Sequence, residues 1–427
     1  MPGSRPFSGH WFTLARKTHR LGPPRLLGDN ASKGTAVDAN AAKSAAQAAG
    51  ITSDARHARL LAELMEAGYQ RAEPPILQPA SVFLDLSGED MRGRLYLTSD
   101  GEGAELCLRP EYTIPLARAY LASPEAGREA AFSYLGPVFR FRPGASGEFL
   151  QAGLESYGRT DPEAADAEIL AVALEAVDAA GGSPLDIRIG DVALFARLIE
   201  ALDLPAPWAR RLRRGFAHGH ALDTIAASAA KSAGIDHSGV LAALAGADQK
   251  GARALVEDLL SIAGISTVGG RSVGEIAERF LEQASVSSGA GLGAEQRTAI
   301  ARFLAIEGDP DTASHELRSL AKDAGLDLGA VLDAFDARNG FLAVHGIDVS
   351  RLRFAASFGR NLDYYTGFVF EVHDPARPEA RPVIGGGRYD RLLTTLGAAC
   401  DIPAVGASIW VERLPEATMP VGAGGSP

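Results

Sequence analysis

The sequence predicts an α+β protein built around an antiparallel sheet. Between residues 73 and 157, short strand-like runs follow one another through connections that are too short for the crossovers of a parallel sheet. Strand-like runs return after residue 350, whereas residues 191–346 are rich in alanine and mostly helical in pattern. An antiparallel sheet flanked by helices, with a helical insertion, accounts for these observations.

The first 50 residues differ in composition from the rest of the chain. They hold seven Lys or Arg against two Asp, and their alanine-rich end has no continuous apolar face. We therefore expect a mobile basic extension here. The first helix is expected from Asp54 to Gly68, with Leu60, Leu61, Leu64 and Met65 on one face.

The remaining elements follow from strand-like and helical patterns along the chain. A helix is expected over residues 161–180, and the strand candidates are 74–79, 94–97, 105–108, 131–142, 147–158, 185–189, 352–358, 367–373 and 403–409. The expected segments are 1–50 as the extension, 51–190 as the first part of the core fold, 191–346 as the mainly helical insertion and 347–427 as the second part of the core fold.

Charge and cysteine content argue against several classes of protein. The formal net charge is -11, whereas binding of a nucleic-acid backbone requires clustered Lys and Arg. The two cysteines, Cys107 and Cys400, form neither a disulfide framework nor a zinc ligand set. The sequence has no apolar run of 18 residues and no secretory signal. We expect a cytoplasmic protein, and we assign no cofactor.

Two long strand candidates carry polar groups on one face. In the candidate 147–158, alternation places Gln151 and Glu155 on one face and apolar residues on the other. Arg140 lies on the polar face of the preceding strand, so an arginine and a carboxylate can point into one cavity. The alternative is a solvated sheet face with a cross-strand ion pair, which contributes little free energy.

Five sequence blocks resemble the histidyl form of class II aminoacyl-tRNA synthetases. FSYLGPVFR at 132–140, with FLQAGLE at 149–155, is similar to the second signature motif of that class. PAVG at 403–406, with VERL at 411–414, is similar to the third motif. The other blocks are LRPEYT at 108–113, GRNLDYYTG at 359–367 with VFE at 369–371, and GGGRYD at 385–390. The resemblance implies a class II synthetase-like antiparallel sheet.

The resemblance also implies a pocket for histidine. A zwitterionic amino acid needs an acceptor for its ammonium, a cation for its carboxylate, and a donor and an acceptor for its imidazole. In the family the counterparts of Glu111 and Thr113 hold the amino group, and the counterpart of Arg360 addresses the carboxylate. The other implied histidine-binding residues are Arg140, Gln151, Glu155, Tyr364, Tyr365 and Tyr389. Asn361 replaces the usual glycine, and this change can move Arg360.

Each of these groups also has a purely structural explanation. Glu111 can cap a helix that begins near Ile114, the tyrosines can be packing residues, and Gly385 to Gly387 can form only a turn. Taken together, the five blocks favour a ligand site.

The parts that charge tRNA are altered. Arg140 and Arg413 match the two arginines that stabilise ATP in the family, so we expect a vestigial ATP site there. The family motif Phe-Arg-x-Glu ends here in Arg142, a cation in place of a carboxylate. The loop 143–147 is short and uncharged, and the chain ends 13 residues after Leu414, where the synthetases continue into an anticodon-binding domain. We expect no tRNA contact.

A histidine pocket without charging parts is similar to the synthetase-like regulatory subunits of ATP phosphoribosyltransferase. PPILQP at 74–79 and FLDLSGED at 83–90 are also similar to the bacterial members of that family. The resemblance implies a non-catalytic protein that partners the short-form catalytic subunit in the first step of histidine biosynthesis. It also implies feedback inhibition by histidine, self-association into a homodimer within a hetero-oligomer, and no membrane partner.

Two other functions are compatible with the same residues. One is a free-standing paralogue that adenylates histidine, which Arg140, Arg360 and Arg413 favour and Arg142 opposes. The other is a scaffold with a vestigial pocket. His218 and His220 also form a possible metal pair, but two lone histidines in a helical insertion are more often solvated or capping, so we assign no metal.

Overall fold

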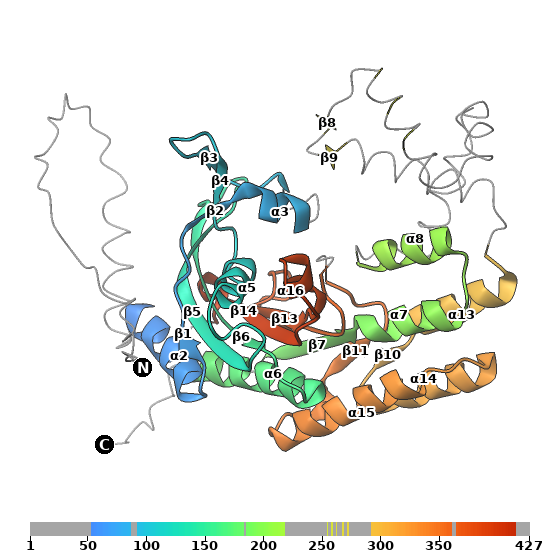
Figure 1. Ribbon diagram of the computed structural model, residues 1–427. Helices are drawn as coiled ribbons and strands as arrows, with labels where there is room; N and C mark the ends of the chain where they lie inside the picture. The colour runs from blue at the N-terminus through green and yellow to red at the C-terminus, as the bar shows by residue number, and fades with distance from the viewer. Residues whose placement is uncertain are drawn as a thin grey trace, which may run out of the picture. The chain divides into compact units, whose positions relative to one another are not determined.

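The computed structural model describes residues 53–86, 92–182, 185–217, 292–360 and 364–415, together with a few positions between 254 and 272 (Figure 1). All of them belong to one compact unit, residues 51–427. The expected extension 1–50, the histidines His218 and His220, and Asn361 lie outside the described residues.

A nine-stranded sheet forms the centre of the described fold, with strand order β1-β5-β6-β14-β13-β12-β7-β11-β10 (Figure 1). Its strands are β1 (Gln70–Arg71), β5 (Ala130–Phe139), β6 (Glu148–Tyr157), β7 (Asp186–Asp191), β10 (Glu307–Gly308), β11 (Arg353–Ala355), β12 (Phe368–His373), β13 (Ile384–Arg388) and β14 (Ala404–Trp410). Neighbouring strands are antiparallel, as the sequence predicted, except for β1 with β5 and β11 with β7. Both parallel pairs join segments far apart in sequence, which leaves the chain length that a crossover needs.

Two smaller sheets complete the strand content of the described chain. One has the order β2-β4-β3, with β2 (Leu77–Pro79), β3 (Leu97–Ser99) and β4 (Glu105–Leu108). The other pairs β8 (Thr267–Val268) with β9 (Arg271–Ser272). The short helix α3 (Ala80–Leu86) packs against β4.

Helices cover both faces of the central sheet. On one face α6 (Pro162–Ala179) packs against β6, β13 and β14, and both α2 (Ser53–Glu66) and α15 (Gly329–Val344) pack against α6. On the other face α5 (Thr113–Leu121) packs against α16 (Arg391–Thr395). The described helices between residues 191 and 346 are α7 (Val192–Ala201), α8 (Ala206–Ala217), α13 (Ala294–Leu304), α14 (Pro310–Ala324) and α15, and the 3-10 helices are η1 (Val349–Arg351) and η2 (Val411–Arg413).

The predicted alternation along β6 is confirmed. Ala152 and Leu154 belong to the main hydrophobic core, which includes residues of α6. Gln151 lies on the opposite face, where it lines a cavity. The apolar half of the strand therefore anchors it to the helical layer and leaves the polar half for the site.

The turn proposed as an alternative for the glycine-rich block is wrong. Gly385 to Gly387 are buried in β13, which pairs with β12 on one side and β14 on the other. A Cβ on Gly386 would lie only 2.4 Å from the carbonyl oxygen of Gly406. Glycine is therefore needed for close packing in the middle of the sheet.

A buried ion network ties the helical layer to the sheet. Asp166 of α6 accepts a hydrogen bond from Arg388 Nε at 2.9 Å and another from Arg338 Nη1 at 3.4 Å. Arg338 of α15 also donates to Asp191 Oδ2 at 2.5 Å. Burial raises the pKa of Asp166 to about 6, although the two arginines pull it down. Each charge in this network depends on its partners because all four side chains are buried.

Candidate functional site

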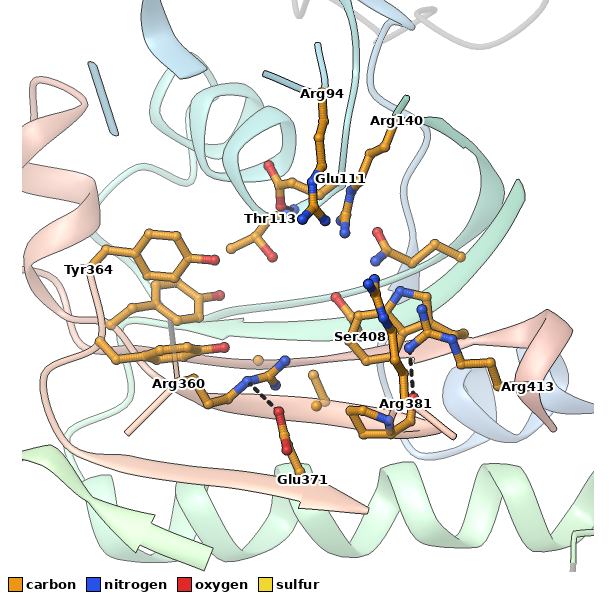
Figure 2. A pocket seen from close by; sticks show the side chains of 18 residues that line it. Arg94, Glu111, Thr113, Arg140, Arg360, Tyr364, Glu371, Arg381, Ser408 and Arg413 are labelled. Atoms are coloured by element: carbon orange, nitrogen blue, oxygen red, sulfur yellow. Dashed lines mark hydrogen bonds and ion pairs between the residues drawn. The ribbon is translucent and has the colours of Figure 1, made fainter. Parts of the chain in front are cut away.

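A cavity of about 400 Å³ lies on the α5 side of the sheet and collects most of the predicted site residues (Figure 2). Nine of the ten residues singled out for the histidine pocket and the ATP site line it: Glu111, Thr113, Arg140, Gln151, Arg360, Tyr364, Tyr365, Tyr389 and Arg413. The tenth, Glu155, is buried and contacts two of the lining side chains. Residues more than 300 positions apart in sequence thus meet at one place.

Glu111 serves both the helix and the cavity. Its carboxylate accepts hydrogen bonds from the backbone N–H groups of Thr113 at 2.6 Å and Ile114 at 2.9 Å, at the start of α5. The capping role proposed from sequence is therefore present in the structure. Burial raises the pKa of Glu111, while these N–H groups and the nearby Arg140 lower it. A carboxylate has about four acceptor sites, so capping leaves capacity for a cation in the cavity.

Glu155 lies behind the cavity wall and holds two hydroxyl groups in place. Thr113 Oγ1 donates to its Oε1 at 2.7 Å, and the Tyr389 hydroxyl donates to its Oε2. Burial raises the pKa of Glu155 to about 8, even though both hydrogen bonds lower it. A Cβ on Gly406 would lie 1.6 Å from Glu155 Oε2, so the neighbouring strand needs glycine to admit this carboxyl group.

Arg360 lies across the floor of the cavity. Its Nε is 3.5 Å from Glu371 Oε1, and its Nη1 donates to the Phe370 carbonyl oxygen at 3.4 Å (Figure 2). A Cβ on Gly385 would lie 2.0 Å from Arg360 Nη1, so the guanidinium occupies space that only glycine leaves open. The glycine-rich strand β13 therefore leaves the space that the guanidinium of Arg360 occupies.

Three tyrosines form one end of the cavity. The rings of Tyr364 and Tyr365 lie 5.2 Å apart between centroids, and Tyr364 meets Tyr389 edge to face at 5.9 Å. Burial raises the pKa of Tyr364 and of Tyr389 well above the ordinary value, so both keep their hydroxyl protons. This end offers aromatic surface together with hydrogen-bonding hydroxyl groups.

The opposite end is rich in arginine. In Figure 2, Arg94 and Arg140 extend into the cavity from one side, and Arg381 and Arg413 lie away from Tyr364. Arg413 stacks over the Trp410 ring at 4.6 Å and donates to the Pro382 carbonyl oxygen at 2.9 Å. Burial lowers the pKa of Arg413 to about 10, which still leaves it charged at neutral pH.

Arg142, the cation found where a carboxylate was expected, does not line the cavity. Both of its terminal nitrogens donate to the carboxylate of Glu412, and its guanidinium stacks over Phe149 at 4.1 Å. It therefore joins the β5–β6 hairpin to η2.

Five polar or aromatic lining residues were missed by sequence reasoning: Arg94, Glu371, Arg381, Ser408 and Trp410. Alternation along β14 would have found Ser408 and Trp410, which share a face with Gly406. Glu371 belongs to the VFE segment at 369–371, but the resemblance gave it no role. Arg381 lies outside the strands and helices, where no periodic pattern could indicate it. Arg94 was placed in the strand candidate 94–97, but the strand there is β3, Leu97–Ser99, and Arg94 precedes it.

Two polar atoms of adjacent strands are buried without a hydrogen-bond partner. They are Gln151 Oε1 on β6 and Trp410 Nε1 on β14, and the two residues are paired in the sheet register. Both side chains line the cavity. Unpaired buried polar atoms are costly, and they recur at ligand sites because a ligand or a small side-chain movement can satisfy them.

Two other features are absent from the described part of the chain. No three His, Cys, Asp or Glu side chains there are grouped to hold a metal ion. None of the helices there is long and apolar enough to cross a membrane.

The chain is similar to proteins of two related kinds. The family model described as Histidyl-tRNA synthetase matches residues 46–268 and 251–414. A protein of Brucella canis named ATP phosphoribosyltransferase regulatory subunit is 42% identical over 358 residues, which is 83% of this chain and 95% of that protein. A protein of the same name from Brucella melitensis biotype 1 is 42% identical over 83% of this chain and 94% of its own length.

Solved structures share the fold. A structure titled as an ATP phosphoribosyltransferase regulatory subunit/histidyl-tRNA synthetase from Bacillus halodurans has a TM-score of 0.59 and 22% identity, covering 85% of this chain and 79% of that chain. A histidine–tRNA ligase subunit from Alicyclobacillus acidocaldarius has a TM-score of 0.51 and 24% identity, covering 92% and 97%. The predicted class II synthetase-like fold is confirmed.

Proposed function

This chain belongs to the family of ATP phosphoribosyltransferase regulatory subunits, which are histidyl-tRNA synthetase-like proteins, and on that basis we propose that it binds L-histidine in the described cavity. We further propose that it is a non-catalytic partner of the short-form catalytic subunit and mediates feedback inhibition by histidine. Its place in histidine biosynthesis follows from the family.

The observation that carries this proposal is that Glu111 and Arg360 line one cavity. A free amino acid presents an ammonium and a carboxylate close together, and this cavity offers one partner for each. Thr113 stands beside Glu111 as a further acceptor for the ammonium. The buried setting strengthens both interactions because the local dielectric is low.

The tyrosine end suits the imidazole ring. The hydroxyl groups of Tyr364, Tyr365 and Tyr389 can donate or accept hydrogen bonds, and a neutral imidazole needs one partner of each kind. Glu155 would act through Thr113 and Tyr389, because it orients both hydroxyl groups. With a pKa of about 8, Glu155 is mostly protonated at neutral pH and adds little negative charge beside Glu111.

The absence of catalysis is supported by how the expected ATP arginines are engaged. Arg140 Nε donates to the Pro110 carbonyl oxygen at 2.6 Å, and Arg413 is anchored to Pro382 and Trp410. Arg142 is paired with Glu412 and provides no acceptor for ATP. These contacts favour a structural role for Arg140 and Arg413, in which they hold the cavity walls together, over a role in binding ATP.

Histidine can regulate the complex only if it binds two states of the complex with different affinity. The coupling is reciprocal, so substrates bound to the catalytic subunit should change the affinity of this chain for histidine. We also propose a homodimer in the cytoplasm as the regulatory unit. The exposed apolar side chains of Leu77, Leu97 and Phe141, each about half exposed, support a protein contact near the small sheet.

The test is calorimetric titration of the full chain with L-histidine, beside a histidine-dependent ATP–pyrophosphate exchange assay on the same sample. We expect binding without exchange, and Arg360→Ala should weaken binding strongly. The matched control is Arg318→Ala, because Arg318 lies on α14 and pairs only with Asp333 and Asp336 among the described contacts. Exchange would indicate an adenylating enzyme. Absence of binding, both alone and with the catalytic subunit, would indicate a scaffold.

A further inference from the structure

We infer that Glu371 and His373 form a proton-sensitive relay that controls how strongly Arg360 binds the carboxylate of the ligand. The inference rests on the proposed function, because it concerns regulation of the same site. Glu371 is a positioning residue for Arg360, and His373 sets how much of the Glu371 charge Arg360 experiences.

The relay runs along one face of β12. Alternation places Glu371 and His373 on the cavity side of the strand, while Phe370 and Val372 pack into the core on the other side. Glu371 Oε1 is 3.5 Å from Arg360 Nε, and Glu371 Oε2 is 3.3 Å from His373 Nε2. The two oxygens of one carboxylate thus contact a cavity arginine and a titratable ring; Figure 2 shows the contact between Glu371 and Arg360.

Exposure increases along the relay. The side chain of Arg360 is 11% exposed, that of Glu371 is 21% exposed and that of His373 is 30% exposed. The imidazole can therefore exchange protons with solvent, while the guanidinium lies mostly out of water. Screening by water is weakest near Arg360. A change of charge on Glu371 or His373 therefore has a large effect on the electrostatic interactions of the Arg360 guanidinium.

Other charged groups surround His373, but none interrupts the contact with Glu371. Asp186 of β7 stands opposite His373 in the sheet register, and Arg188 stands opposite Glu371. Asp374 follows His373 and is bound to Arg377. Arg381 lines the same cavity as Glu371.

The direction of the effect follows from competition for Arg360. When His373 is neutral, the negative charge of Glu371 acts mainly on Arg360 and opposes a second carboxylate at the same guanidinium. When His373 is protonated, it neutralises Glu371 and adds a positive charge nearby. The ligand carboxylate is then held more tightly, so lower pH should raise affinity through this relay.

The experiment compares L-histidine binding by the full-length protein and its His373→Gln variant, measured by calorimetry from about pH 8 to about pH 5.5, the range in which an ordinary histidine titrates. The ligand also titrates in this range, but its ionisation cancels in the ratio of the two dissociation constants. We expect wild-type affinity to rise about 3- to 10-fold relative to His373→Gln as the pH falls, the size of one partly screened charge interaction.

Three further measurements separate the relay from a structural effect. His315→Gln and His345→Gln are controls, since both histidines are exposed on other elements, and they should follow the wild-type profile. In a Glu371→Gln background, His373→Gln should have a much smaller pH-dependent effect, because only the direct charge of the imidazolium remains. L-Histidinol lacks the carboxylate, so its binding should not depend on His373.

Parallel pH profiles for wild type and His373→Gln would overturn the relay while leaving the histidine site intact. An equal effect of His373 on histidinol would also overturn it. Failure of the wild-type protein to bind L-histidine at every pH would instead contradict the proposed function.

Discussion

Replacing Gly385 by alanine should remove most of the affinity for histidine without unfolding the protein. The new Cβ would lie 2.0 Å from Arg360 Nη1, 2.4 Å from its Nη2 and 2.5 Å from its Cζ. All three atoms belong to the end of a flexible side chain, so the guanidinium can move aside. The backbone of Gly385 lies outside the left-handed region, so alanine is not strained there.

The expected size follows from the interaction that is displaced. A hydrogen bond to a charged group contributes about 1.5–3 kcal/mol, so moving Arg360 away from the ligand carboxylate should weaken binding about 10- to 100-fold. Stability should change by less than about 1 kcal/mol, because the three atoms nearest to the new methyl group belong to a side chain that can move, and alanine loses less entropy on folding than glycine.

Calorimetry for affinity and thermal unfolding for stability together test this prediction. Gly340→Ala is the control, because a Cβ at that position on α15 meets nothing within 4 Å. The double variant Gly385→Ala with Arg360→Ala should bind no more weakly than Arg360→Ala alone. Wild-type affinity in Gly385→Ala would refute the assignment of Arg360 to the carboxylate.

Three other predictions concern charged groups of the same structure. Glu155 keeps its proton in the folded protein up to about pH 8, whereas the unfolded chain loses it near pH 4.3, so this group reduces stability by up to about 1.4 kcal/mol per pH unit between those values. Thermal unfolding of Glu155→Gln should therefore depend less on pH in that window, and an unchanged slope would contradict the buried proton. Asp166→Ala should destabilise the protein by about 3–5 kcal/mol in urea unfolding, because it leaves two buried arginines without their shared partner. A double-mutant cycle on Arg142 and Glu412 should give a coupling of about 0.5–1 kcal/mol, and a coupling near zero would show that the hairpin is held by packing alone.

Most of the strand framework could be predicted from sequence because apolar side chains alternate with polar ones. The strand β6 was expected at 147–158 and lies at Glu148–Tyr157, and its two faces divide as predicted. Three strands of the central sheet were missed: β1 and β10, which have only two residues each, and β13. In β13, three successive glycines have no side chains from which a pattern can be recognised. The role of these glycines is visible only in the structure, where the neighbouring strands and Arg360 pack closely against them.

The site was predicted less evenly than the fold. Residues inside the resembling blocks, such as Glu111 and Tyr389, could be assigned to one pocket from the amino-acid sequence alone. Arg94 and Arg381 could not, because residues in loops reach the cavity through the path of the chain and not through a repeating pattern. The alternative roles of Glu111 were not exclusive, since one carboxylate can cap a helix and face a cavity.

The dual role of Glu111 also limits how much ligand binding in the cavity can change the stability of helix α5. A cation drawn to this carboxylate shares it with the two N–H groups that begin α5, and α5 packs against α16 in the segment that follows Tyr389. A helix cap contributes about 1 kcal/mol, so a signal carried through this one contact cannot exceed about a fivefold change in an equilibrium. Stronger communication with a partner protein would require other residues of the cavity wall to respond as well.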